Sequence, residues 1–138
     1  MRVVPRAAIA SASEGQARFR YAQRLHRPDE FSAVMAARHV LRGAVFDLHY
    51  RLTTRGHQTS RLGLIVSKRL ARAASMRNAV KRQCREAFRL VAIDIPPCDL
   101  VLRLTQPVKG SNARDRVQKK LWRMDLVSLL KRLPMLPR

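Results

Sequence analysis

The chain is poor in acidic side chains. Against 29 Lys and Arg it has 9 Asp and Glu in 138 residues, which leaves a formal net charge of +20. Such a charge repels itself unless a polyanion is present, so nucleic acid is the first candidate partner and an anionic membrane surface the second. So few carboxylates leave little for a nuclease made of protein alone, and no paired carboxylates, Ser/His/Asp set or P-loop is found. We therefore predict no catalytic residue.

Cysteine is also scarce. Cys84 and Cys98 form no CxxC pair and the 4 histidines are scattered, so no zinc spacing appears and no metal site is predicted. Free thiols are typical of a reducing compartment, and the cytoplasm is the expected location. A run of about eighteen apolar residues, which a membrane-spanning helix needs, is absent.

What the chain does have is enough apolar sequence, 46%, for one domain with a core. Residues 1–20 are Arg-bearing, rich in Ala and Ser and nearly free of acids, and they are predicted to be a basic, disordered extension, although a transit peptide has a similar composition. Residues 21–133 are the predicted domain and 134–138 a short tail.

Hydrophobic patterns predict helices, strands and their order. The expected order is αββαβα, a small two-layer α/β (α+β) sandwich in which helices pack on a central sheet. The predicted helices run from Pro28 to Arg42-Gly43, over 75–93 with Ser75 as N-cap, and over 109–133 with Ser111 or Asn112 as N-cap and Pro134 at the end. The predicted strands cover 44–52, 61–69 and 98–107.

Two packing expectations follow from these patterns. The strand at 61–69 is apolar on both faces, which predicts a central strand that forms a hairpin with the strand before it. In the last helix, Trp122 is assigned to a second apolar stripe, and the core stripe is expected to comprise Val117, Leu121, Met124 and Val127.

The segment 61–92 concentrates the positive charge, with nine basic side chains and one acidic side chain, Glu86. At about 100° per residue, one stripe of the helix is apolar and is expected to be buried: Met76, Val80, Cys84, Ala87, Phe88 and Val91. The adjacent stripe is cationic at every fourth residue: Arg77, Lys81, Arg85 and Arg89. Like charges at this spacing cost a few tenths of a kcal/mol each, so contact with a polyanion is favoured over a merely solvated face. Glu86 is expected to pair with Arg82 or Arg89.

The segments RLGLIVSKR, Arg77-Asn78 and KRQCREAFR (81–89) resemble the signature of the bacterial ribonuclease P protein subunit, which reads xGLxVSK[KR] and then RNRxxKRxxRExFR. RLHRPDEFSAVM, FDLHY and CDLVLRLTQP extend the resemblance over residues 24–131. The chain departs from the pattern at Ala79, where the second Arg of RNR would stand, and in a loop before Arg77 that is one residue longer. It also has Met35 and His49 where an aromatic side chain is usual.

The resemblance implies a ribosomal-protein-domain-like fold with a left-handed βαβ crossover. It implies that the catalyst is the RNA subunit, a ribozyme that hydrolyses precursor tRNA with bound magnesium and releases the 5′ leader. The protein would assist as about one copy for each catalytic RNA, with precursor tRNA as the second partner, no membrane and no obligate protein partner. Magnesium would be held mainly by the RNA.

The resemblance also implies roles for individual residues. The leader cleft between the first helix and the sheet would be lined by Phe31, Met35 and His49. RNA contact would fall to Lys68, Arg69, Arg77, Asn78, Lys81, Arg82, Arg85 and Arg89. An ordinary core position for Phe31 and an exposed strand position for His49 remain equal alternatives.

Other protein classes fit parts of the sequence. A ribosomal protein would share the composition and is separated only by the KRxxREAFR resemblance. A membrane-surface protein would need an apolar stripe free to insert, but the stripe beside the cations is committed to the sheet. A DNA-binding helix-turn-helix is disfavoured because strands, not a second helix, flank the basic helix.

Overall fold

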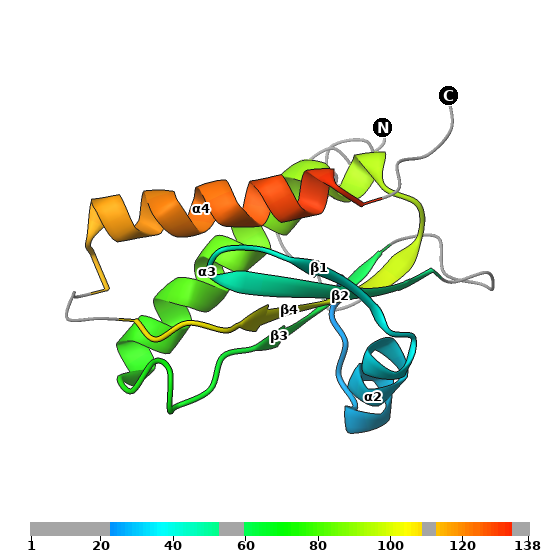
Figure 1. The fold of residues 1–138 in the computed structure, drawn as a ribbon, viewed down its shortest axis with the longest axis horizontal. Coiled ribbons are helices and arrows are strands. Elements are labelled where there is room, and N and C mark those ends of the chain that lie inside the picture. The colour runs from blue at the N-terminus through cyan, green and yellow to red at the C-terminus, as the bar shows by residue number, and fades with distance from the viewer. Residues whose placement is uncertain (1–22, 53–59, 109–112, 134–138) are drawn as a thin grey trace, which may run out of the picture.

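The computed structural model describes residues 23–52, 60–108 and 113–133. Its elements are α2 (Pro28–Ala36), β1 (His39–Arg42), β2 (Phe46–Leu52), β3 (Arg61–Ile65), α3 (Ala74–Val91), a 3₁₀ turn η2 (Ala92–Asp94), β4 (Cys98–Leu104) and α4 (Arg116–Lys131) (Figure 1). The predicted α+β class is confirmed. The order is αβββαβα, because the sequence patterns missed β1. The predicted extension 1–20 and tail 134–138 lie outside the described residues.

The missed strand follows an early end of α2. The helix ends at Ala36, and Arg38 takes a left-handed backbone conformation with φ 58°, so the chain turns there and not at Arg42-Gly43. The strand that follows, β1, has only 4 residues and pairs antiparallel with β2 at the edge of the sheet. A strand this short carries too few residues for its alternation to be read.

The strand order in the sheet is β1-β2-β4-β3. β2 pairs antiparallel with β4, and β3 pairs parallel with β4. The predicted β2–β3 hairpin and the central place of β3 are therefore wrong. The chain leaves β3 through α3 and returns as β4, a crossover that makes β3 and β4 parallel neighbours and leaves β3 at the edge. β3 is apolar on both faces because elements cover both of them.

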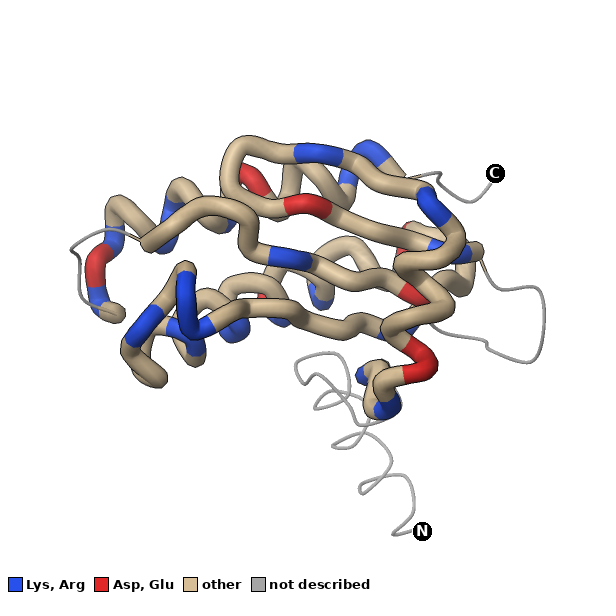
Figure 2. Tube along the Cα trace, turned by 60° about the horizontal axis from the view of Figure 1, so that its bottom comes forward, with Lys and Arg blue, Asp and Glu red and all other residues tan. Residues whose placement is uncertain are grey.

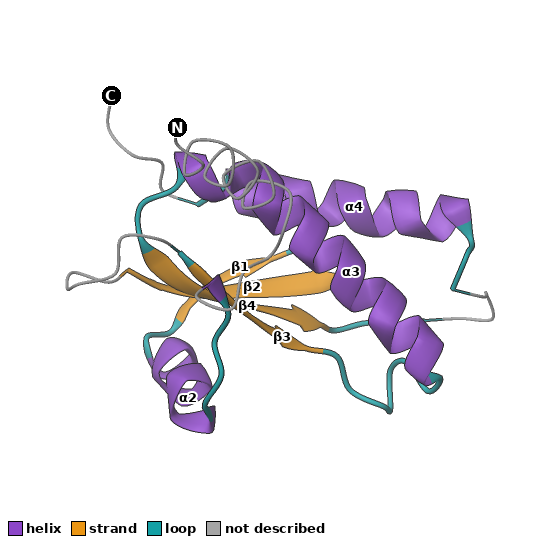
Figure 3. Cartoon of the chain, turned by 180° about the vertical axis from the view of Figure 1, so that it is seen from behind, coloured by secondary structure: helices purple, strands orange, loops and turns teal. Residues whose placement is uncertain are grey.

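The sheet is covered on both faces. Figures 1 and 3 show α3 and α4 on one face and α2 on the other. The main core lies between the sheet and the two long helices and includes Phe46, Leu48, Phe88 and Leu126. A smaller cluster under α2 consists of Leu25, Val34 and Val101, with Phe31, Met35 and Ile65 packed against it. The molecule therefore has three layers, with a large and a small apolar cluster between them, whereas two layers were predicted, because α2 packs on the face of the sheet opposite α3 and α4.

The main helix, α3, buries the stripe that its periodicity predicts: Met76, Val80, Cys84, Ala87, Phe88 and Val91. Its first turn differs from the prediction. The helix begins at Ala74 with Ala73 as N-cap, and Ser75 is already helical and exposed. The helix ends at Val91, two residues before the predicted end, and the 3₁₀ turn continues to Asp94.

Helix α4 packs on the core with the apolar stripe that contains Trp122, which the sequence pattern did not favour as the core stripe. Trp122 and Leu126 are buried, whereas Val117, Leu121 and Met124 are 70%, 56% and 59% exposed, so the predicted core stripe is wrong at these three positions. Its fourth member, Val127, is partly buried and packs against the core. The helix begins at Arg116, and its N-cap is Asp115, which accepts a hydrogen bond from the Gln118 amide. The predicted caps at 111 and 112 and the predicted stop at 134 lie outside the described residues.

Two carboxylate contacts tie the layers together. Asp125 of α4 accepts hydrogen bonds from the backbone amides of Ala44, Val45 and Phe46 at 2.9–3.0 Å, which fixes the β1–β2 connection on the helix. A Cβ on Gly43 would lie 2.7 Å from the Asp125 Oδ1, so this close approach requires glycine. The connection and α4 are therefore held as one unit.

On the opposite face, Arg61 of β3 joins α2 to the sheet. Its guanidinium donates two 2.9 Å bonds to Asp99 of β4 and one 2.8 Å bond to Glu30 of α2. Glu30 also accepts from the amides of His26 and Arg27 at the start of the helix. The backbone amide of Arg27 is the main cause that lowers the pKa of Glu30, followed by that of His26, and Arg61 adds to the shift.

Candidate nucleic-acid interface

Positive charge gathers at one end of the molecule. Figure 2 shows Lys and Arg positions close together at the loop between β3 and α3 and at the start of α3. In the described ranges the acids of the sheet and α2 are engaged: Glu30 and Asp99 with Arg61, and Asp47 with Arg42 at 3.0 Å. These acids are therefore not available to neutralise the cations of α3.

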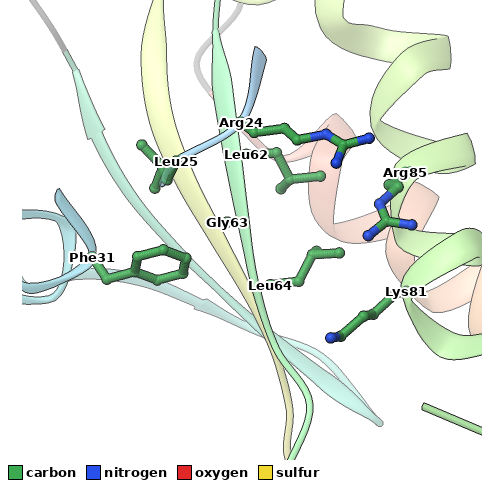
Figure 4. A pocket seen from close by; sticks show the side chains of 8 residues that line it. All are labelled: Arg24, Leu25, Phe31, Leu62, Gly63, Leu64, Lys81 and Arg85. Atoms are coloured by element: carbon green, nitrogen blue, oxygen red, sulfur yellow. The ribbon is translucent and has the colours of Figure 1, made fainter. Parts of the chain in front are cut away.

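A hollow of about 170 Å³ crosses the edge of the sheet at β3. We call it the edge hollow, and its lining comprises Arg24, Leu25, Phe31, Leu62, Gly63, Leu64, Lys81 and Arg85. Figure 4 shows the Phe31 ring on the α2 side of β3 and the Lys81 and Arg85 side chains on the α3 side. The edge hollow thus brings together an aromatic residue predicted for the leader and cations predicted for RNA contact.

The Phe31 ring lies directly over Gly63. A Cβ at position 63 would come within 2.5 Å of the ring atom Cε2, a separation that real side chains do not adopt. Phe31 is half-buried, and the partly exposed ring packs in the small cluster under α2. Phe31 therefore packs against this cluster and also lines the edge hollow, and its contact with a leader stays a prediction.

The cations of the edge hollow repel one another. Burial is the first cause that lowers the pKa of Arg85, and the positive charge of Arg24 is the second. The Nε atom of Arg85 is buried and donates to no acceptor in the part of the chain that the structure describes. Arg24 reaches this place because residues 24–25 run beside β3, with a 3.0 Å hydrogen bond from the Leu25 amide to the Leu62 carbonyl. A bound anion would relieve the repulsion.

Two members of the predicted cationic stripe have partners inside the protein. Arg77 donates through Nη1 to the carbonyls of Ala71 and Arg72 at 3.0 and 2.7 Å, which folds the β3–α3 loop against the helix. Arg89 pairs with Glu86 at 2.6 Å, as predicted for the lone acid of this helix. The four cations therefore share one side of the helix, but they do not form one uniform surface for binding.

The remaining residues predicted for RNA contact lie elsewhere. Asn78 and Arg82 are exposed on the side of α3 that faces α4. Lys68 and Arg69 are exposed in the turn after β3, and Arg69 lines a second depression together with Arg72 and Met76. These residues do not line the edge hollow.

The three residues predicted for the leader cleft are only partly brought together. Met35 packs in the same small cluster as Phe31. His49 is buried on β2, opposite Val101 of that cluster, so an exposed strand position is wrong. Burial is the main cause that lowers the pKa of His49, and its Nε2 has no hydrogen-bond partner among the described residues. The His49 imidazole is therefore buried and not exposed to solvent.

The sequence patterns missed residues that line these surfaces. Arg24 was not assigned to the site, although it stands beside the apolar Leu25 that anchors the segment to β3. Gly63 was part of a quoted motif, but its role as the floor for Phe31 depends on a contact across the sheet. Neither role has a signal in local periodicity, because both partners come from other elements.

The side chains that could bind a metal ion are not clustered in the described residues. No cluster of three His, Cys, Asp or Glu side chains occurs within residues 23–52, 60–108 and 113–133. Burial raises the pKa of the Cys84 thiol to about 12 and that of Cys98 to about 11, so both thiols stay protonated in the core. Over the same ranges, no helix has the length and apolarity needed to cross a membrane.

The fold and these surfaces define a class, the small basic α+β domain whose exposed cations suit a polyanion. Comparison with known proteins is more specific. Residues 19–133 match the family model described as Ribonuclease P. A ribonuclease P protein component from Azoarcus sp. (strain BH72) is 45% identical over 117 residues, which is 85% of this chain and 91% of that protein. Another from Bordetella petrii is 48% identical over 84 residues, 59% of this chain and 68% of that protein.

Solved structures agree in fold. The RNase P protein of Thermotoga maritima matches with a TM-score of 0.65 at 31% identity, covering 80% of this chain and 97% of that one. The RNase P protein of Staphylococcus aureus matches with a TM-score of 0.67 at 25% identity, covering 79% and 93%. The chain belongs to the ribonuclease P protein family and is a protein component of this endoribonuclease. The family resemblance read from the KRxxREAFR segment is thereby confirmed.

Proposed function

We propose that this chain binds the catalytic ribonuclease P RNA and the single-stranded 5′ leader of precursor tRNA. In this role it assists the magnesium-dependent endonucleolytic cut that gives the mature tRNA 5′ end. One copy pairs with each RNA, no further protein partner is needed, and the complex works in the cytoplasm. The family membership supports the RNA partner, and the edge hollow supports the leader.

The observation that carries the leader assignment is the composition of the edge hollow. A single strand offers flat bases and regularly spaced phosphates, and proteins bind it with aromatic faces next to cations. Phe31 supplies the aromatic face on one side of β3, and Lys81 and Arg85 supply the cations on the other. A base stacked on an aromatic side chain contributes roughly 1–3 kcal/mol. A leader that crosses the β3 edge would use both.

Other exposed cations, together with the Asn78 amide, would hold the catalytic RNA. Asn78 and Arg82 on α3 and Lys68 and Arg69 in the loop are exposed and lie away from Phe31. Contacts of this kind go to phosphate oxygens, which position an RNA without reading its sequence. Arg77 and Arg89 support this surface through their internal bonds and lie in the same helix.

Magnesium belongs with the RNA in this proposal. Glu30 and Asp99 both form ion pairs with Arg61, so they offer no free cluster of oxygen atoms for a divalent ion. When bound to the RNA, the metal supplies the activated water and charge stabilisation for phosphodiester hydrolysis. The side chains of this chain position RNA and leader and neutralise their phosphates.

The deciding experiment is cleavage of a precursor tRNA by a bacterial ribonuclease P RNA at low millimolar magnesium, with and without this protein. We expect 5′-leader removal with the protein where the RNA alone is silent, because the added cations replace high salt in screening the phosphates. Binding of the RNA without any rescue of cleavage would contradict the proposed function.

The leader assignment has its own test at Phe31. Phe31→Ala is expected to weaken precursor tRNA binding roughly tenfold, in line with the loss of one stacked base, and to leave mature tRNA unchanged. Phe31→Leu is the matched control, since it keeps apolar packing over Gly63 and removes the flat face. Equal losses for precursor and mature tRNA, or full leader discrimination in Phe31→Leu, would remove the stacking role.

A further inference from the structure

Three exposed apolar side chains follow one side of α4. Val117, Leu121 and Met124 lie four and three residues apart and are all largely exposed, and we call them the α4 ridge. Figure 1 shows α4 at the margin of the molecule, on the outside of the sheet. We propose that the α4 ridge binds an anionic lipid surface, with α4 lying along the membrane interface.

The α4 ridge is not needed for the core of the protein. The side of α4 that packs on the core is a different one, with Trp122, Leu126, Leu129 and Leu130 buried. Apolar side chains that are exposed singly are ordinary on a protein surface. Three of them at helical spacing are neighbours and form one continuous patch, which is typical of a binding surface.

The charges around the α4 ridge complement an anionic occupant. Lys120 and Lys131 are exposed and follow the same side of α4 at about 100° per residue, and Arg116 is exposed at its start. Asp125 is the one acid of this helix, and its carboxylate accepts hydrogen bonds from the amides of the β1–β2 connection. Apolar side chains beside cations are typical of helices that bind at an anionic membrane interface. The net charge of +20 adds attraction to such a surface.

Other occupants fit the α4 ridge less well. Aliphatic side chains offer a base no flat face and offer a phosphate no donor, so RNA is not the occupant. A second copy would bring two chains of +20 together over three apolar side chains, whereas a stable interface uses roughly 20–30 residues from each partner. A folded protein would need a groove to receive the outer side of a helix, whereas a fluid lipid surface adapts to it.

The membrane alternative was disfavoured from the sequence because of a different stripe. The apolar stripe of α3, which includes Cys84 and Phe88, is buried and cannot insert. The α4 ridge is exposed and meets the requirement for an apolar stripe that is free to insert. It is also separate from the edge hollow, whose lining contains no residue of α4. The inference therefore goes beyond the proposed function and does not rest on it.

The first test is flotation of the full protein with vesicles of phosphatidylglycerol and phosphatidylcholine in equal parts. We expect Leu121→Ser with Met124→Ser to weaken vesicle binding by about tenfold or more, because two apolar side chains no longer leave water. The matched control is Leu52→Ser with Leu90→Ser, which makes the same kind of change at exposed positions outside α4 and keeps the net charge. Equal binding by the two double variants would overturn the inference, since charge alone would then account for adsorption.

A second test measures insertion directly. Met124→Cys places a thiol on the α4 ridge for an environment-sensitive fluorophore, while the native Cys84 and Cys98 are buried. With the same vesicles, we expect a blue shift of the label at position 124 and none for a label at Leu90→Cys. The absence of a shift at position 124 would overturn the inference.

A third measurement separates lipid from protein as the occupant. The probe is a synthetic amphipathic peptide with leucine on one face and glutamate on the other. We expect it to compete poorly with the vesicles for the labelled protein. Binding of the peptide that depends on Leu121, together with no binding to vesicles, would assign the α4 ridge to an acidic protein and overturn the lipid assignment. Cleavage assays with ribonuclease P RNA test the proposed function independently of all three measurements.

Discussion

Individual cations of α3 differ in what they contact, although they repeat at the same spacing. Arg77 holds two carbonyls of the preceding loop, Arg89 holds Glu86, and Lys81 and Arg85 line the edge hollow. A spacing of four residues places side chains on one side of a helix, but the neighbours of that side change along its length. The loop lies beside the first turn, and the edge of β3 lies beside the next two.

A prediction at this scale separates Arg77 from Lys81. Arg77→Gln should lower the free energy of unfolding by roughly 1–2 kcal/mol, because two carbonyl bonds from a charged donor are lost. Lys81→Gln should leave stability within about 0.5 kcal/mol and weaken RNA binding. Chemical denaturation and RNA titration of both variants check the expectation. Unchanged stability in Arg77→Gln would show that its carbonyl bonds contribute nothing net.

At the scale of the element, the apolar pattern of α4 predicts the wrong buried face. The helix has two apolar stripes, and the one with Trp122 and Leu126 is buried while the one with Val117 and Leu121 faces solvent. Periodicity establishes that a stripe exists and does not rank two stripes that are both apolar. The contact that decides between them is Asp125, which must reach the amides of the β1–β2 connection.

The neighbouring pair Trp122 and Leu121 tests this orientation. Trp122→Ala should destabilise the protein by about 3–5 kcal/mol, since a large buried side chain leaves a cavity. Leu121→Ala, at a side chain that is 56% exposed, should change stability by no more than about 0.5 kcal/mol. Thermal and denaturant unfolding of the two variants measure the difference. The opposite ranking would restore the stripe that the sequence favoured.

At the scale of the whole molecule, α2 is attached to the sheet by a thin apolar cluster and by Arg61. That guanidinium bridges Glu30 of α2 and Asp99 of β4, so the attachment includes a charge contact that responds to pH. Because α2 also carries Phe31 over Gly63, the geometry of the edge hollow depends on this bridge. Stability and the shape of the edge hollow are coupled through it.

The coupling predicts a dependence on acid. The pKa of Glu30 is lowered in the folded protein, chiefly by the Arg27 and His26 amides and further by Arg61, so its contribution is present above pH 4.5 and is lost as pH falls through the folded value. We expect Glu30→Gln to be less stable than wild type at pH 7 and to converge with it below that range.

Unfolding measured at several pH values checks this convergence. Asp29→Asn is the control, because it removes a charge from the same turn at an exposed position whose contact with Arg27 is 3.5 Å long. A difference between wild type and Glu30→Gln that stays constant with pH would show that the carboxylate charge is not involved.

The sequence by itself determined the class of fold, the buried stripe of α3, the lone pairing of Glu86 and the family. Each of these depends on local periodicity, local spacing or a contiguous motif, and such signals are carried within a single element. The strand order, the buried face of α4 and the division of the α3 cations between the β3–α3 loop and the edge hollow were decided by tertiary structure. They depend on contacts between elements distant in the chain: Gly63 of β3 with Phe31, and Asp125 with the β1–β2 connection.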